Sequence, residues 1–196
     1  MPVEWTSPPD RVDRSILILT CVDGALRNST AGPCTSAREA VAALAARRVP
    51  VILTSYHPRA ELLAVQEELG LDEPFIAENG AALGVPRGYF ARLPQVSTPN
   101  GRWEIIDLDP PSVEDAIEML MWLYRVSGDS PLLVGVGSSW KDHLLLRHVD
   151  VPVLVNNPSE DQRQLRAHFP DAYLTSSPGP YGWSEAILGS SVVRAD

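Results

Sequence analysis

Three short segments of the chain hold residue types that can do acid–base, nucleophilic or anion-binding chemistry. Each segment directly follows an apolar run. Together they supply a thiol, carboxylates, hydroxyls and one ammonium group, from Cys21, Asp23, Ser55, Ser138, Ser139, Lys141 and Asp142. Lys141 is the only lysine among the 16 basic residues. These side chains are the first candidates for a functional site, provided that the fold brings the three segments together.

The apolar runs before these segments have the length and composition of buried parallel strands. Strands are expected over residues 15–21, 50–55, 75–78, 81–85, 103–108, 132–136, 151–155 and 173–175. Helices are expected over residues 35–45, 58–69, 112–126, 139–148, 160–169 and 183–193. This alternation predicts an α/β fold, a Rossmann-like three-layer α/β/α arrangement around a mostly parallel sheet. Ligands of such sheets bind beyond the carboxyl ends of the strands, where the three segments would meet.

Length and composition indicate a single domain over residues 1–196, with 1–14 as an N-terminal leader. Residues 86–111 hold five prolines and are expected to form a small excursion from the sheet. The net charge of −9 argues against a nucleic-acid partner, and no apolar run is long enough to span a membrane. The first residues lack the apolar core of a secretion signal, so a cytoplasmic location is expected.

The order of the three segments resembles that of the motifs of the haloacid dehalogenase (HAD) superfamily of aspartyl phosphatases. The resemblance rests on Cys21-Val22-Asp23-Gly24-Ala25-Leu26, Thr54-Ser55-Tyr56-His57 and Gly137-Ser138-Ser139-Trp140-Lys141-Asp142. Other segments are similar to the type IIB members, and most of all to mannosyl-3-phosphoglycerate phosphatases: Arg59-Ala60-Glu61, residues 74–80 (PFIAENG), Gly88-Tyr89-Phe90 and residues 179–186 (GPYGWSEA). The match runs from about Ile16 to Leu188.

The resemblance implies a role for each position of the site. Asp23 stands at the general acid and base, and Ser55 at the hydroxyl that binds phosphate. Cys21 replaces the aspartate that attacks phosphorus and ligates magnesium, and Ser138 replaces another metal-binding aspartate. Asp142 is retained, so Asp142 and Asp23 are the remaining candidate metal ligands. The family's lysine has no counterpart between residues 112 and 131.

These replacements change the chemistry that the site can support. Magnesium prefers hard carboxylate oxygens in octahedral geometry, so two lost carboxylates and a soft sulfur predict weak or lost binding. No cofactor is therefore expected, or Mg²⁺ if the site still functions. Each lost charge-stabilising group costs on the order of 10²–10³ in rate. Cys21 is a weak candidate nucleophile, because burial raises the pKa of a thiol. An inert, small apolar residue is the simpler interpretation.

Lys141 suggests a different use for the same cleft. It adds a positive charge where two negative charges are missing, so Ser55, Gly24, Ser139 and Lys141 are predicted to bind phosphate or a phosphorylated small molecule without metal. The alternative is that Lys141 is an ordinary solvated lysine. On this hypothesis the chain is a non-catalytic or anion-binding pseudophosphatase. The competing hypothesis is an active phosphomonoesterase, a sugar-phosphate hydrolase with altered motifs.

The type IIB phosphatases carry a substantial cap domain, which here looks nearly absent. Asn79 and Gly137 are 58 positions apart, and predicted elements fill much of that segment. Loss of a cap exposes surface that a second copy of the chain could cover in a homodimer. Trp122 and Trp183 are expected in the core or at an interface. Trp140 could plug the cleft, and the chain would then be a structural subunit.

Overall fold

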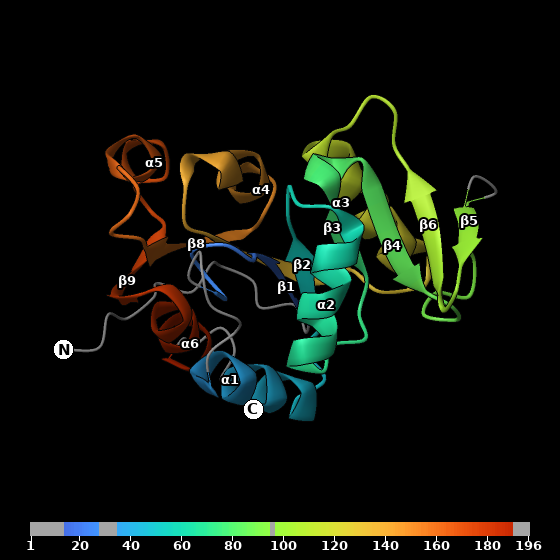
Figure 1. Cartoon of the computed structure of the whole chain (residues 1–196), viewed down its shortest axis with the longest axis horizontal. Coiled ribbons are helices and arrows are strands. Elements are labelled where there is room, and N and C mark those ends of the chain that lie inside the picture. The colour runs from blue at the N-terminus through green and yellow to red at the C-terminus, as the bar shows by residue number, and fades with distance from the viewer. Residues whose placement is uncertain (1–13, 28–34, 95–96, 190–196) are drawn as a thin grey trace.

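A computed structural model describes residues 14–27, 35–94 and 97–189 of the chain. Most of the predicted leader, residues 1–13, lies outside the described residues. The described chain forms one nine-stranded sheet, in the order β5-β6-β4-β3-β2-β1-β7-β8-β9 (Figure 1). The strands are β1 (Ile16–Cys21), β2 (Val51–Thr54), β3 (Phe75–Ala77), β4 (Ala82–Pro86), β5 (Ser97–Asn100), β6 (Trp103–Asp107), β7 (Leu132–Gly137), β8 (Val151–Asn156) and β9 (Tyr173–Pro178).

The centre of the sheet is parallel and one end is antiparallel. From β3 through β2, β1, β7 and β8 to β9 every neighbouring pair runs parallel. At the other end β4, β6 and β5 pair antiparallel with their neighbours. In the parallel part the carboxyl ends of the strands share one edge, so the loops after β1, β2 and β7 lie close together.

Helices cover both faces of the sheet, as the alternating pattern predicts. They are α1 (Thr35–Ala46), α2 (Arg59–Leu69), α3 (Val113–Val126), α4 (His143–Arg147), α5 (Arg163–His168) and α6 (Gly179–Gly189), with 3₁₀ turns η1 (Glu78–Gly80) and η2 (Trp140–Asp142). One core cluster joins the sheet to α1, α2 and α6, and a second joins it to α3, α4 and α5. The three-layer α/β/α prediction is therefore confirmed.

Trp183 anchors the last helix beneath the central strand. Its side chain is fully buried, and its indole N–H donates to Thr20 Oγ1 at 3.0 Å. Because a buried indole N–H needs an acceptor, the neighbouring hydroxyl makes the burial of this large ring favourable. This bond fixes α6 against β1 just before the chain enters the Cys21 loop. Trp183 is thus a core residue.

Two boundaries differ from expectation. Residues 86–111 were expected to leave the sheet, but β6 pairs with β4 along its whole length and β5 extends the same sheet. β5 has the sequence STPN, which lacks the apolar alternation that marks a strand. Helix α6 begins at Gly179, four residues before the predicted start, because Pro180 is compatible with a first helical turn.

Candidate functional site

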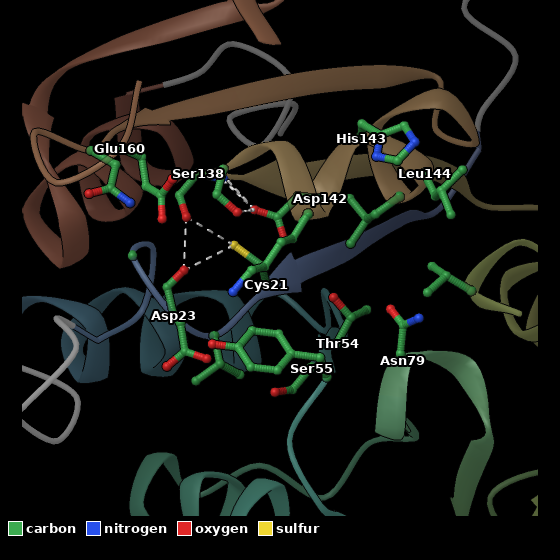
Figure 2. A pocket seen from close by; sticks show the side chains of 18 of the residues that line it. Cys21, Asp23, Thr54, Ser55, Asn79, Ser138, Asp142, His143, Leu144 and Glu160 are labelled. Carbon is green, nitrogen blue, oxygen red and sulfur yellow. Dashed lines mark hydrogen bonds between the residues drawn. The ribbon is translucent and has the colours of Figure 1, made fainter. Parts of the chain in front are cut away.

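A cavity of about 600 Å³ opens at the carboxyl ends of β1, β2 and β7 (Figure 2). It is lined by all eight residues that the sequence analysis singled out: Cys21, Asp23, Gly24, Ser55, Ser138, Ser139, Lys141 and Asp142. The parallel strand order brings these three distant segments together, as expected from the strand-end rule. Their chemical roles stay predictions.

The floor of the cavity is formed by Cys21, Ser138 and Asp142. The Cys21 thiol lies 3.6 Å from the backbone carbonyl oxygen of Asp23 and 3.7 Å from Ser138 Oγ, and can donate its one proton to either. The Ser138 hydroxyl donates to the same Asp23 carbonyl at 2.8 Å. These three atoms form a closed triangle in which each polar group has a partner within the protein (Figure 2).

Asp142 completes the floor by holding the loop after β7. Its Oδ2 accepts the backbone N–H groups of Ser138 at 2.8 Å and Ser139 at 2.9 Å, and the Ser139 hydroxyl at 3.3 Å. Buried Gln162 also holds this loop, donating to the Ser138 carbonyl at 2.6 Å and the Val155 carbonyl at 2.8 Å. The Asp142 carboxylate therefore acts first as a cap for this loop.

Burial shifts the pKa values of both ionisable groups of the floor in the same direction. Loss of solvation raises the pKa of the Cys21 thiol well above its ordinary value, and the nearby Asp142 carboxylate raises it further. Loss of solvation also raises the pKa of Asp142, against the lowering effect of the Ser138 and Ser139 amides. At neutral pH the thiol is thus protonated, which leaves little nucleophilic thiolate.

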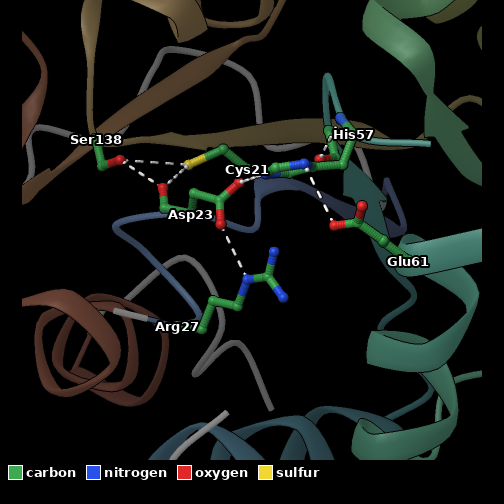
Figure 3. Close-up of polar contacts among 7 residues, drawn as sticks. Cys21, Asp23, Arg27, His57, Glu61 and Ser138 are labelled. Atoms are coloured by element: carbon green, nitrogen blue, oxygen red, sulfur yellow. Dashed lines mark hydrogen bonds and ion pairs between the residues drawn. The ribbon is translucent and has the colours of Figure 1, made fainter. Parts of the chain in front are cut away.

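The Asp23 side chain belongs to an ion-pair chain, which we define as Arg27, Asp23, His57 and Glu61 (Figure 3). Arg27 Nε donates to Asp23 Oδ1 at 2.9 Å, and His57 Nε2 lies 3.0 Å from Asp23 Oδ2. His57 Nδ1 in turn lies 3.3 Å from Glu61 Oε2. Both oxygens of the Asp23 carboxylate are therefore in contact with basic side chains.

Lys141 and Ser55 keep unused hydrogen-bonding capacity in the cavity. Lys141 Nζ lies 4.4 Å from the centre of the Tyr56 ring, a cation–π contact, and it contacts no carboxylate among the described residues. Ser55 Oγ accepts the His57 backbone N–H at 3.1 Å, which leaves its own proton to donate. Both groups can therefore donate hydrogen bonds to a ligand in the cavity.

The other two predicted phosphate-binding residues already have partners. The Gly24 N–H donates to the Arg27 carbonyl at 2.8 Å, and both the amide and the hydroxyl of Ser139 donate to Asp142. Gly24 nevertheless has a positional requirement: its φ is +74°, and a Cβ atom would lie 2.5 Å from Ser138 Oγ. Glycine permits this close approach of the Asp23 loop to the Ser138 loop.

A tight turn at the cavity edge is held by a forked ion pair. Glu78, Asn79 and Gly80 have positive φ values of 56°, 56° and 87°. Arg59 stabilises this left-handed run by donating to Glu78 Oε1 at 3.1 Å and Oε2 at 3.0 Å. Figure 2 shows the resulting position of Asn79 beside the cavity.

The expectation that Trp140 plugs the cleft is wrong. Trp140 is absent from the cavity wall and packs against the second core cluster instead. Its ring stacks on His143 at 4.7 Å with an interplanar angle of 3°, and contacts His168 edge-on at 5.4 Å. The 3₁₀ turn at 140–142 rotates this side chain outward, so Lys141 and Asp142 face the cavity.

Three contributors to the site escaped the sequence analysis. Arg27 and Glu61 complete the ion-pair chain, and Gln162 clamps the loop after β7. Arg27 follows Asp23 by four residues, a spacing that favours an ion pair when the segment turns back on itself. Gln162 carried no signal, because its partners are backbone carbonyls 24 and 7 residues away.

Within the described residues, no group of three or more His, Cys, Asp or Glu side chains has the arrangement of a metal site. In the same part of the chain, no helix combines the length and the apolar character needed to cross a bilayer.

Comparisons with known proteins agree with this architecture. No family model matches the chain. A glucosyl-3-phosphoglycerate/mannosyl-3-phosphoglycerate phosphatase of Persephonella marina is 30% identical over 121 residues, covering 61% of this chain and 45% of that protein. A phosphatase with the same name from Methanococcoides burtonii is 35% identical over 75 residues, covering 38% and 28%. The chain thus spans less than half the length of each of these relatives.

Solved structures share the fold at low sequence identity. A Thermotoga maritima protein superposes with a TM-score of 0.64 at 13% identity, over 90% of this chain and 98% of that one. A sugar phosphatase of HAD subclass IIB superposes with a TM-score of 0.62 at 14% identity, over 89% and 98%. These structures therefore share the fold of the chain, and the curated phosphatases are similar to it in sequence over part of its length.

Proposed function

We propose that the cavity binds a phosphate group without a metal ion and that the chain does not hydrolyse phosphate monoesters by a metal-dependent route. The observation that carries the proposal is the closed triangle of the Cys21 thiol, the Ser138 hydroxyl and the Asp23 carbonyl. The phosphate is free or carried by a small molecule. The curated relatives are named as phosphatases, so this proposal assigns the same cleft a different use.

The floor of the cavity does not fit a magnesium ion. Mg²⁺ is bound by hard oxygen ligands and several waters, whereas the nucleophile position here offers a protonated sulfur. Ser138 supplies a neutral hydroxyl, whose proton is already donated to the backbone carbonyl of Asp23. Asp142 Oδ2 accepts the N–H groups of Ser138 and Ser139. It would have to give up these hydrogen bonds in order to bind an ion. A divalent cation would therefore gain little charge compensation here.

The same groups are unsuited to in-line attack on phosphorus. The Cys21 thiol is protonated, and no described arginine or lysine contacts it to stabilise a thiolate. Both carboxylate oxygens of Asp23 are already engaged, one by Arg27 and the other by His57. A general acid or base must lie within hydrogen-bond reach of the reacting group, and these two contacts occupy the oxygens that would do so.

Phosphate binding is supported by the charge balance on the open side of the cavity. Lys141 supplies an ammonium group that no described carboxylate neutralises, and Ser55 supplies a free hydroxyl proton. An ammonium with three donors binds phosphate as a point charge. The Tyr56 ring positions Lys141 through a cation–π contact, and the three N–H donors of the ammonium group leave it able to donate to a ligand as well.

Isothermal titration with inorganic phosphate tests the proposal. One titration contains a chelator that removes divalent cations, and a second contains magnesium. We expect binding in the chelator, unchanged by the metal, and about tenfold weaker binding in Lys141→Met. Arg92→Met is the matched control, because Arg92 is exposed and does not line the cavity. Binding that requires magnesium, or that ignores Lys141, would contradict the proposal.

The second candidate function is an active phosphomonoesterase, favoured by the retained Asp23 at the cavity wall beside a histidine. A generic phosphate ester assayed with magnesium separates the two. We expect no turnover by the wild type and measurable turnover by the Cys21→Asp, Ser138→Asp double variant. Robust wild-type turnover that Asp23→Asn abolishes would establish the phosphomonoesterase instead.

A further inference from the structure

Helix α3 carries large apolar side chains on the face that points away from the core. Its inner face packs Ala116, Ile117, Leu120, Leu123 and Tyr124 into the second core cluster. On the opposite face Trp122 is 42% exposed and Val126 is 51% exposed. Exposed tryptophan is uncommon on a solvated helix face and is enriched at protein–protein contacts.

The surface around Trp122 is broad and shallow rather than a closed cavity. It has a volume of about 810 Å³ and includes Met119 and Met121 on α3, Leu108 before the helix and His148 after α4. Methionine side chains adapt to a partner surface, and sulfur packs favourably against aromatic rings. This surface lies on α3, away from the phosphate cavity, and shares no lining residue with it.

Two charges of opposite sign flank Trp122 on the same side of the helix. Glu118 lies one turn before Trp122 and Arg125 about one turn after it, and both are exposed. Neither side chain forms an ion pair with another described residue. Glu118 and Arg125 are seven positions apart, which is about two helical turns or about 10 Å along the axis.

We propose that this face of α3 pairs with α3 of a second copy of the chain, antiparallel and around a two-fold axis beside Trp122. An antiparallel two-fold places Glu118 of each copy opposite Arg125 of the other, so two ion pairs form at once. The same axis brings Trp122 of one copy against Met121 of the other. A closed symmetric dimer buries the apolar centre and leaves charges at its edges.

The charge pattern is what points to a second copy rather than to a different protein. An isologous contact requires a patch that is complementary to itself, with acid and base at equal distances on the two sides of the axis. Glu118 and Arg125 meet that condition around the midpoint next to Trp122. The chain as a whole carries a net charge of −9, so two copies repel unless the contact face is locally balanced.

Charge exchange on the full chain tests this arrangement, with mass measured by light scattering over a dilution series. We expect the wild type to be a dimer that dissociates on dilution. Glu118→Arg and Arg125→Glu should each weaken self-association by at least about tenfold, because each places like charges opposite one another. Combining the two substitutions in one chain should restore the dimer.

A mixing experiment makes the test specific. Equal amounts of the Glu118→Arg chain and the Arg125→Glu chain should form a heterodimer, because each reversed charge then faces its opposite. Trp122→Ala should weaken association by about thirtyfold. Glu67→Arg is the matched control and should leave the dimer intact, because Glu67 is exposed on α2, at the other face of the sheet. A wild type that stays monomeric, or a dimer that ignores all α3 substitutions, would refute the proposal.

Discussion

The floor of the cavity and the ion-pair chain lie side by side, yet they hold their polar groups in opposite ways. Two of the three floor residues supply neutral donors: the Cys21 thiol and the Ser138 hydroxyl are 5% and 1% exposed as residues and bond within the protein. In the ion-pair chain the ionisable side chains are open to solvent, with the Arg27 and Asp23 side chains 24% and 25% exposed. Both arrangements begin at the single loop after β1.

The difference shows which part of the site tolerates an unpaired charge. A charge in the floor has no nearby cation and little solvent, so its cost is large. A charge in the ion-pair chain is partly solvated, so losing its partner costs much less. Binding of a divalent cation would need concentrated negative charge in the floor, where Cys21 and Ser138 supply neutral groups.

The largest effect should come from returning a carboxylate to the floor. We expect Cys21→Asp alone to lower the free energy of unfolding at neutral pH by about 3 kcal/mol, because it places a second carboxylate beside Asp142 without a cation. Urea denaturation measures this directly. The loss should shrink at acidic pH, where the new carboxyl can stay protonated.

Cys21→Ser is the control, since it keeps a neutral donor of similar size at the same position. A Cys21→Asp variant as stable as the Cys21→Ser variant at neutral pH would show that the floor accommodates negative charge. The contrast between the two regions would then be lost.

The contribution of Asp142 to the free energy of unfolding should depend on pH, with a smaller effect in a defined direction. Burial raises the pKa of Asp142 in the folded protein above its ordinary value. Its contribution to stability is therefore fully present below the ordinary carboxyl range and is lost as pH rises through the raised pKa. The free energy of unfolding of the wild type, relative to Asp142→Asn, should fall over that window by at most about 1.4 kcal/mol per pH unit.

Unfolding curves of both proteins at matched pH values measure this difference. Asparagine keeps an oxygen that can accept the Ser138 and Ser139 amides, so the loop cap is retained in the variant. A difference that grows with rising pH would mean that the amides outweigh burial and that Asp142 is stabilised as an anion.

The smallest effect should come from the ion-pair chain. We expect Arg27→Ala to lower the free energy of unfolding by about 0.5 kcal/mol, because His57 still contacts Asp23 and solvent reaches the carboxylate. Thermal unfolding of the Arg27→Ala and Cys21→Asp variants, measured under the same conditions, compares the two losses of stability. If the Arg27 variant loses as much stability as the Cys21 variant, the two regions do not differ in the way described.

Residues near one another in the chain behaved as their local patterns predicted. The apolar runs ending at Cys21, Thr54 and Gly137 became neighbouring parallel strands, and the strand-end rule placed the polar residues after them in one cavity. The Asn79-Gly80 turn formed because its left-handed backbone suits those residues. Such features depend on short-range preference and on the periodic burial of side chains.

Trp140, β5 and Gln162 were decided by contacts between distant parts of the chain. Trp140 points away from the cavity because its ring packs against His168. Strand β5 forms because β6 offers it an unpaired edge. Gln162 has partners that no spacing rule connects to it. Local sequence thus specifies which elements form and which side chains reach the cavity. The hydrogen-bond partners that set the charge of each group exist only after the sheet and its two helical layers are assembled.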